Sequence, residues 1–148
     1  MKKIAVGVVG VGGRMGEMTV KVIMEDPLAS IAGGVVRINS PMVGADLGTT
    51  VGSEHLGIQV TDQLLDVFSK SDVVIDFSLP DAGAKIIDAA LTTSTPLVVG
   101  TTGLTKSQEQ ALMDTSKTIP LVYASNTSLG INRANISFIL LKHKGYLT

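Results

Sequence analysis

The sequence predicts an α/β domain whose doubly wound, mostly parallel sheet carries helices on both faces. Short apolar runs rich in valine and isoleucine alternate along the chain with segments whose apolar residues recur at helical spacing. The apolar runs are almost continuous, which is typical of strands that are buried on both sides in a parallel sheet. This alternation of strands and helices implies right-handed βαβ crossovers and one open sheet.

The composition excludes several classes of protein. The 148 residues contain no Cys and two histidines, His55 and His143, so we expect no disulfide, no cysteine-ligated cluster and no metal site. Lys and Arg number 12 against 13 Asp and Glu, which is not the basic excess of nucleic-acid binders. No apolar run approaches the ~18–20 residues that span a bilayer, and the N-terminal run is too short for a signal peptide. We therefore expect a cytoplasmic protein with no membrane or nucleic-acid partner.

Periodicity gives the expected order of strands and helices. Helical spacing predicts a first helix that begins near Gly13 and ends at Asp26-Pro27. The motif T-K-S-Q at residues 105–108 matches a capping box and marks the start of the last helix of the sheet. The expected strands cover residues 4–9, 30–36, 72–77, 96–99 and 119–123, and the later helices cover residues 63–69, capped by Thr61-Asp62, 82–91 and 106–117.

A long segment after the second strand has no convincing periodicity. Residues 37–57 contain several glycines and predict a loop. Loops longer than ~12–15 residues in compact domains are usually functional or mobile. The alternative is that apolar side chains anchor this segment on the protein surface. The candidates for such an anchor are Val43, Leu47, Val51 and Leu56.

Glycines between the first strand and the first helix predict a phosphate-binding turn. Residues 10–16 read G-V-G-G-R-M-G. Glycine lets the backbone approach a pyrophosphate, and the helix N-terminus offers unpaired N–H groups. The spacing departs from the strict G-x-G-x-x-G, and a tight turn alone would also favour glycine. Because the turn opens the first βαβ unit, we favour a Rossmann-like dinucleotide-binding domain.

The end of the second strand bears on the choice of cofactor. A site for NAD usually offers Asp or Glu about 20 residues after the glycines, where it accepts from the ribose 2′-hydroxyl. Here that place is held by Val35-Val36-Arg37. Arg37 could pair with a 2′-phosphate, and Arg14 could add charge near the other phosphates. This favours NADPH over NADH, or use of both, unless Arg37 is only a solvated residue at a strand end.

Polar motifs follow the later strands, at the edge where open α/β sheets bind ligands. Residues 76–80 read D-F-S-L-P, and residues 100–103 read G-T-T-G. The two threonine hydroxyls could bond a carboxamide or a substrate carboxylate, although a turn without a ligand also accounts for them. A third polar stretch begins at Ser125, and an Asx-turn would explain its Asn126 without any function.

Together these motifs resemble a known family. V-G-G-R-M-G at residues 11–16, D-F-S-x-P, V-G-T-T-G at residues 99–103 and A-S-N-x-S-x-G-x-N at residues 124–132 are similar to the amino-terminal domain of 4-hydroxy-tetrahydrodipicolinate reductase, the dihydrodipicolinate reductase of bacterial lysine and diaminopimelate synthesis. The resemblance implies a domain over residues 1–132 that binds NADH or NADPH. It also implies hydride transfer to a cyclic dicarboxylate in a homotetrameric enzyme.

The resemblance also implies a role for individual residues. Two positions depart from the family: Val36 replaces an acidic ribose ligand that many members carry, and Thr127 stands where members often have Phe. Thr102 would also approach the substrate. The implied cofactor contacts are Gly10, Gly13, Arg14, Met15 and Gly16 at the pyrophosphate, Arg37 at the adenosine ribose, Phe77 and Ser78 along the cofactor, Gly100, Thr101 and Thr102 at the nicotinamide, and Ala124, Ser125 and Asn126 beside its ring.

The family's second domain has no counterpart among these residues. The resemblance implies that the histidine and lysine of that domain's motif H-H-x-x-K-x-D-x-P-S-G-T bind substrate and handle the proton, and that the sheets of that domain build the tetramer. His143-Lys144 does not match the motif. Residues 133–148 predict a terminal helix that departs from the family. We therefore expect no catalytic residue and little or no turnover from this chain alone. The alternatives are a non-catalytic nucleotide-binding or partner-binding module, and one half of a split reductase.

Overall fold

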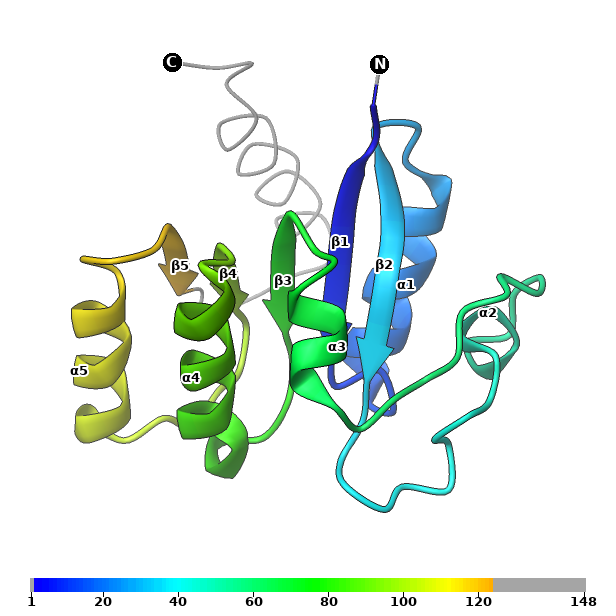
Figure 1. Ribbon diagram of the computed structural model, residues 1–148. Helices are drawn as coiled ribbons and strands as arrows, with labels where there is room; N and C mark the ends of the chain where they lie inside the picture. Colours follow the sequence, from blue (N-terminus) through cyan, green and yellow to red (C-terminus); the bar gives the residue numbers. More distant parts are fainter. Residues whose placement is uncertain (1, 124–148) are drawn as a thin grey trace.

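The computed structural model describes residues 2–123 and confirms the predicted fold class. A single parallel sheet has the strand order β2-β1-β3-β4-β5 (Figure 1). The predicted helix over residues 133–148 lies outside the described residues. The strands are β1 (Ile4–Val9), β2 (Ala29–Val35), β3 (Val73–Asp76), β4 (Leu97–Val99) and β5 (Leu121–Tyr123).

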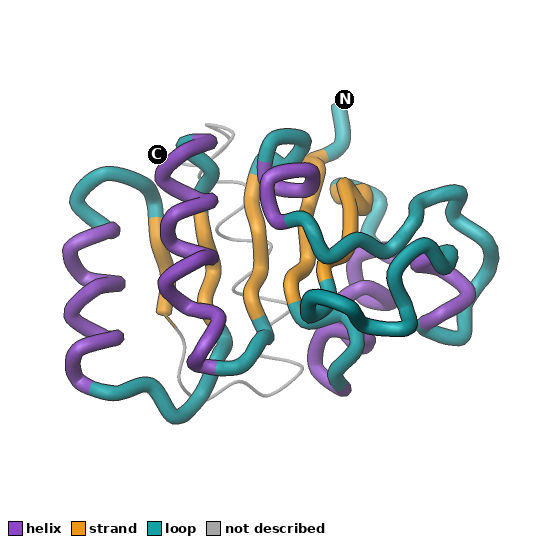
Figure 2. The backbone as a smooth tube through the Cα atoms, turned by 60° about the horizontal axis from the view of Figure 1, so that its bottom comes forward, coloured by secondary structure: helices purple, strands orange, loops and turns teal. Residues whose placement is uncertain are grey.

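Helices cover both faces of the sheet. In Figure 1, α3, α4 and α5 lie in front of the strands and α1 lies behind them, and Figure 2 shows the same arrangement from another side. Two apolar clusters fill the spaces between sheet and helices, one including Val20 and Ile23 of α1 and the other Phe68 of α3, Ile86 of α4 and Leu112 of α5. The helices are α1 (Arg14–Glu25), α2 (Leu47–Thr50), α3 (Leu64–Phe68), α4 (Gly83–Thr93), which follows a 3-10 turn at Pro80–Ala82, and α5 (Lys106–Thr115).

The capping predictions had opposite outcomes. At α5 the capping box is confirmed, because Gln108 N donates to Thr105 Oγ1 at 3.2 Å and Thr105 N donates to Gln108 Oε1 at 2.9 Å. At α3 the prediction that Thr61-Asp62 caps the helix is wrong. The N-cap is Gln63, without a side-chain bond, because the backbone of Thr61 is extended and forms a bridge with Val35 at the edge of the sheet.

The segment between β2 and this bridge, residues 37–60, is anchored on the domain. We call it the crossover segment. It contains the short helix α2, which the sequence did not predict, and it extends beyond the β2 edge of the sheet (Figure 2). Leu47 and Val51 are 0% and 1% exposed and join the core cluster under α1, whereas Val43 is 42% exposed. The anchored alternative is therefore correct for two of the proposed side chains.

Candidate functional site

The carboxyl ends of the central strands meet at one edge of the sheet. Backbone bonds hold their loops together: Gly10 N donates to Val35 O at 2.8 Å, Phe77 N to Val9 O at 2.9 Å and Gly100 N to Asp76 O at 2.8 Å. The glycine turn, the D-F-S loop and the G-T-T loop are thus neighbours. This is the edge at which open α/β sheets bind ligands.

Two glycines of the turn, Gly10 and Gly16, are required by close backbone packing. Gly10 has φ +89°, and a Cβ there would lie 2.7 Å from the backbone carbonyl of Phe77. A Cβ at Gly16 would collide with the carbonyl of Gly10, because the first turn of α1 packs directly on the loop. By contrast, a Cβ at Gly13 would meet that carbonyl oxygen at 3.5 Å, an ordinary contact. The turn therefore keeps bare backbone where α1 begins.

Three amide groups at the start of α1 are available to an anion. Gly13 N donates to Gly10 O at 3.1 Å, and Glu17 N donates to Gly13 O at 3.0 Å. The amides of Arg14, Met15 and Gly16, in between, donate to no residue within the described range 2–123. Unpaired N–H groups and the positive end of the helix dipole favour a phosphate at this position.

The end of β2 presents a cation rather than a local carboxylate. Val36 is 8% exposed and belongs to the core, which explains why an apolar residue stands there. Arg37 is exposed, and among residues 2–123 its guanidinium has no ion-pair partner. The guanidinium of Arg37 is therefore accessible to an anion, and its pairing with a 2′-phosphate stays a prediction.

A buried carboxylate ties the D-F-S loop to the G-T-T loop. Asp76 is 3% exposed; its Oδ1 accepts from Ser78 N at 2.8 Å and its Oδ2 accepts from Thr101 Oγ1 at 3.2 Å. Thr101 Oγ1 also lies 3.1 Å from Ser78 O, a second acceptor for its one proton. Burial raises the pKa of Asp76, and the bonds from Ser78 and Thr101 offset only part of that rise. The Thr101 hydroxyl thus joins two loops of the fold.

Replacement of the Thr101 hydroxyl tests whether its bond to Asp76 holds the two loops together. Thr101→Val is expected to lower the free energy of unfolding by about 1–3 kcal/mol, because a buried carboxylate loses a donor. The folded pKa of Asp76 is raised above the unfolded value, so ionisation costs stability as pH rises through the folded pKa. The loss should therefore be larger at pH 8 than at pH 4 in urea denaturation. Thr101→Ser keeps the hydroxyl and should behave as the parent; an equal loss at both pH values would contradict the tie.

Two further predicted contacts, Gly100 and Thr102, lie in the G-T-T loop. Gly100 is buried, and a Cβ there would collide with the ring of Phe77, so the ring of Phe77 covers Gly100. Thr102 is exposed, and its hydroxyl bonds to no residue in the part of the chain that the structure describes. Thr102 is thus open to a ligand at the carboxyl edge. The remaining predicted contacts, Ala124, Ser125 and Asn126, lie outside the described residues.

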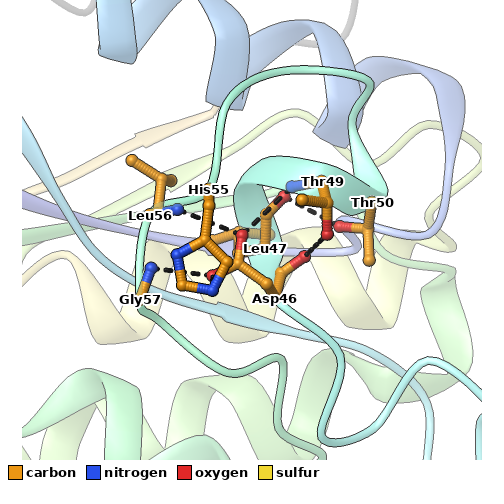
Figure 3. A network of polar contacts seen from close by, with 7 residues as sticks. All are labelled: Asp46, Leu47, Thr49, Thr50, His55, Leu56 and Gly57. Carbon is orange, nitrogen blue, oxygen red and sulfur yellow. Dashed lines mark hydrogen bonds and ion pairs between the residues drawn. The ribbon is translucent and has the colours of Figure 1, made fainter.

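The crossover segment is held together by Asp46 and touches the glycine turn. Asp46 accepts from Thr49 N and Leu56 N at 3.1 Å and from Gly57 N at 2.7 Å, so it caps α2 and closes the following loop (Figure 3). Leu47, the next residue, packs against Gly34 of β2. The segment also approaches the glycine turn directly, since a Cβ at Gly12 would lie 3.3 Å from the sulfur of Met42. The crossover segment therefore supports the turn from the β2 side.

Acid should release the Asp46 contacts. Burial alone raises the pKa of Asp46, but the amides of Leu56, Thr49 and Gly57, with His55, outweigh it and lower the pKa from 3.8 to about 2. Because the folded pKa is lowered, the stabilisation is present above about pH 4 and is lost as pH falls toward 2. Asp46→Asn should therefore lower the urea midpoint at pH 6 and flatten its fall toward pH 2.5. His55→Ala removes an exposed imidazole that lies 3.4 Å from the Asp46 carboxylate but leaves its three amide donors, so it should keep most of the fall in stability toward acid pH. If Asp46→Asn showed the same fall in urea midpoint toward pH 2.5 as the parent, the role of Asp46 would be contradicted.

A separate apolar cavity lies between α4 and α5. Its volume is about 250 Å³, and its walls include Ile87, Leu97 and Leu104. It reaches the carboxyl edge through Asp76 and Thr101, whose polar atoms are bonded to each other. No residue of the glycine turn lines it, so it is distinct from the phosphate position.

The described residues form neither a metal-binding cluster nor a membrane-spanning helix. Within residues 2–123, no group of three or more His, Asp or Glu side chains is arranged to hold a metal ion. None of the described helices is long and apolar enough to cross a bilayer.

Solved structures share the fold of this chain. GenD2 from gentamicin A biosynthesis, solved in complex with NAD, matches 84% of this chain and 35% of its own with a TM-score of 0.63 and 21% identity. A biliverdin reductase from Synechocystis, solved with biliverdin and NADP+, matches 81% of this chain and 37% of its own with a TM-score of 0.58 and 18% identity. At these identities the likeness shows the fold alone.

Sequence relatives identify the family. A 4-hydroxy-tetrahydrodipicolinate reductase from Psychrobacter arcticus is 40% identical over 131 residues, and one from Alkalilimnicola ehrlichii is 42% identical over 127 residues. These matches cover 88% and 86% of this chain but 47% and 48% of the relatives, so the chain spans about half their length. The sequence model described as "Dihydrodipicolinate reductase, N-terminus" matches residues 4–127. The chain therefore belongs to the dihydrodipicolinate reductase family and corresponds to its N-terminal, NAD(P)-binding domain.

Proposed function

We propose that this domain binds NADPH in preference to NADH, with the cofactor diphosphate on the backbone of the glycine turn. The observation that carries the proposal is the set of free amides of Arg14, Met15 and Gly16 at the start of α1, above a turn that admits no side chain at Gly10 or Gly16. Main-chain donors of this kind fit a diphosphate because they need no bulky side chain and carry the helix dipole. The residues present therefore fit the group.

The other proposed contacts would surround this position. Arg37 would hold the 2′-phosphate, and Arg14, exposed at the first helical position, would add charge near the diphosphate. Phe77 and Ser78 would lie along the cofactor, because their loop adjoins the glycine turn through the bond from Phe77 N to Val9 O. The backbone of residues 100–102 would orient the nicotinamide, with Thr102 toward the substrate.

We also propose the reaction that this domain serves. The relatives are 4-hydroxy-tetrahydrodipicolinate reductases, and a bound nicotinamide supplies the hydride for such a reduction. The residues described here would position the cofactor and hold its phosphates. They include no group that we assign as the acid, so we expect little or no turnover from these 148 residues alone. An activity assay that gave full reductase turnover from this chain would overturn that part of the proposal.

Paired calorimetric titrations of NADPH and NADH test the binding. Arg37→Ala is expected to weaken NADPH binding by about 1–3 kcal/mol and to leave NADH binding unchanged, because it removes a charge-assisted bond to the 2′-phosphate. Lys85→Ala, which removes an exposed cation from α4, is the matched control and should change neither. Absence of saturable binding of both dinucleotides to the parent chain would refute the proposed function. An equal loss for both would refute the role of Arg37.

A further inference from the structure

The structure brings a carboxylate to the end of β2 from a distant part of the chain. Thr61 lies beside β2 on the side away from β1: Thr61 N donates to Gly34 O at 3.1 Å, and Val36 N donates to Thr61 O at 2.9 Å. Asp62 follows immediately. Asp62, which is distant in sequence, therefore flanks Val36 and Arg37 at the end of β2.

The carboxylate of Asp62 faces the turn that Arg37 begins. Its Oδ2 accepts from the backbone amide of Asn39 at 3.3 Å, and its Oδ1 accepts from Gln63 Nε2 at 2.8 Å. Asn39 has φ +64°, a conformation that asparagine tolerates, and the turn closes with a bond of 3.1 Å from Ser40 N to Arg37 O. Asp62 thus contacts, through the amide of Asn39, the small turn that Arg37 begins at the end of β2.

The carboxylate is charged at neutral pH and can accept further bonds. The side chain of Gln63 and the amide of Asn39 lower the pKa of Asp62. Each carboxylate oxygen can accept about two hydrogen bonds, so capacity remains on both. An anion at this point attracts hydroxyl donors and repels a phosphate.

We propose that Asp62 is a specificity-determining residue at the adenosine end of the cofactor. It accepts a hydrogen bond from the ribose hydroxyls of NADH and opposes the 2′-phosphate of NADPH, while Arg37 attracts that phosphate. The pair therefore moderates the preference for NADPH and lets the domain use both dinucleotides. This inference rests on the proposed function. Asp62, which follows the crossover segment, would supply the carboxylate that Val36 does not.

The test compares dinucleotide affinities of the full 148-residue chain and its Asp62→Asn variant by calorimetry. Asparagine keeps an oxygen for the amide of Asn39 and removes the charge. The ratio of Kd for NADH to Kd for NADPH is expected to rise about three- to tenfold. Asp62→Glu keeps the charge and should stay near the parent ratio. Asp88→Asn, which removes an exposed carboxylate from α4, should leave the ratio unchanged.

The outcomes separate this inference from the proposed function. If the parent chain binds both dinucleotides and Asp62→Asn changes the ratio by less than about twofold, the role of Asp62 is refuted and the proposed function stands. If the parent chain binds neither, the proposed function fails and the role of Asp62 fails with it. Circular dichroism checks the fold of each variant. If Asp62→Asn does not fold, Asp62→Ser takes its place under the same two criteria.

Discussion

Gly16→Ala is expected to abolish tight dinucleotide binding and to lower the free energy of unfolding by about 3 kcal/mol. The new methyl group would collide with the carbonyl of Gly10, and both partners are backbone, so no side chain can rotate away. Helix α1 would have to move off the turn, which would displace the amides of Arg14 and Met15 from the diphosphate position. Urea denaturation and calorimetric titration with NADPH measure the two effects.

Gly13→Ala is the matched control for the loss of stability. Its methyl group would meet Gly10 O at 3.5 Å, and the φ of −94° at this N-cap suits any residue. We expect a loss of less than about 1 kcal/mol, because alanine is only a poorer N-cap than glycine. Equal stability losses in the two variants would contradict the close packing of α1 on the turn.

Leu47→Ala is expected to lower the free energy of unfolding by about 2–4 kcal/mol and to weaken NADPH binding. Leu47 is fully buried, and its methyl groups fill the space beside Gly34 and Val11, at the base of the glycine turn. Truncation to alanine would leave a cavity there. The crossover segment would then lose the contact by which it supports the glycine turn. Urea denaturation gives the first effect, and titration of the folded variant at low temperature gives the second.

Val43→Ala provides the comparison within the same segment. Val43 is 42% exposed, so its truncation should change the free energy of unfolding by less than about 0.5 kcal/mol. A folded Leu47→Ala variant with parental affinity for NADPH would show that the crossover segment stabilises the domain without supporting the turn.

Local patterns were enough to predict most of the framework. The strands are apolar runs that depend little on context, and the capping box at Thr105 is completed by residues three positions apart. The glycine turn was predictable for the same reason, because its position between a strand and a helix follows from periodicity. What these features share is that neighbouring residues determine them.

The errors and omissions arise from contacts between distant residues. Thr61-Asp62 was expected to cap α3, but Thr61 pairs with β2, which no local pattern reveals. Helix α2 was missed because it is a single turn that depends on Asp46, which also binds the amides of Leu56 and Gly57. The spacing of Asp46 and Thr49 is typical of an N-cap and its third helical residue, and this signal could have located α2.

In the candidate site, too, some features follow from neighbouring residues and others from contacts between distant residues. Residues 10–16 and Arg37 are proposed as cofactor contacts from their places after strands. The internal role of Thr101, by contrast, depends on Asp76, whose carboxylate lies 3.2 Å from the Thr101 hydroxyl in the folded chain. Asp76 was part of a recognised motif, but its function as a tie between two loops required the structure. Asp62 likewise reaches the end of β2 only through the folding of the crossover segment.

An NMR titration of the ¹⁵N-labelled chain with NADPH tests the central claim most directly. If the diphosphate lies on the glycine turn, the amide signals of Gly12, Arg14, Met15 and Gly16 should shift together in a saturable manner, and those of Ser116 and Lys117 at the end of α5 should not. Saturation with NADPH that leaves the signals of residues 12–16 unchanged would contradict the account.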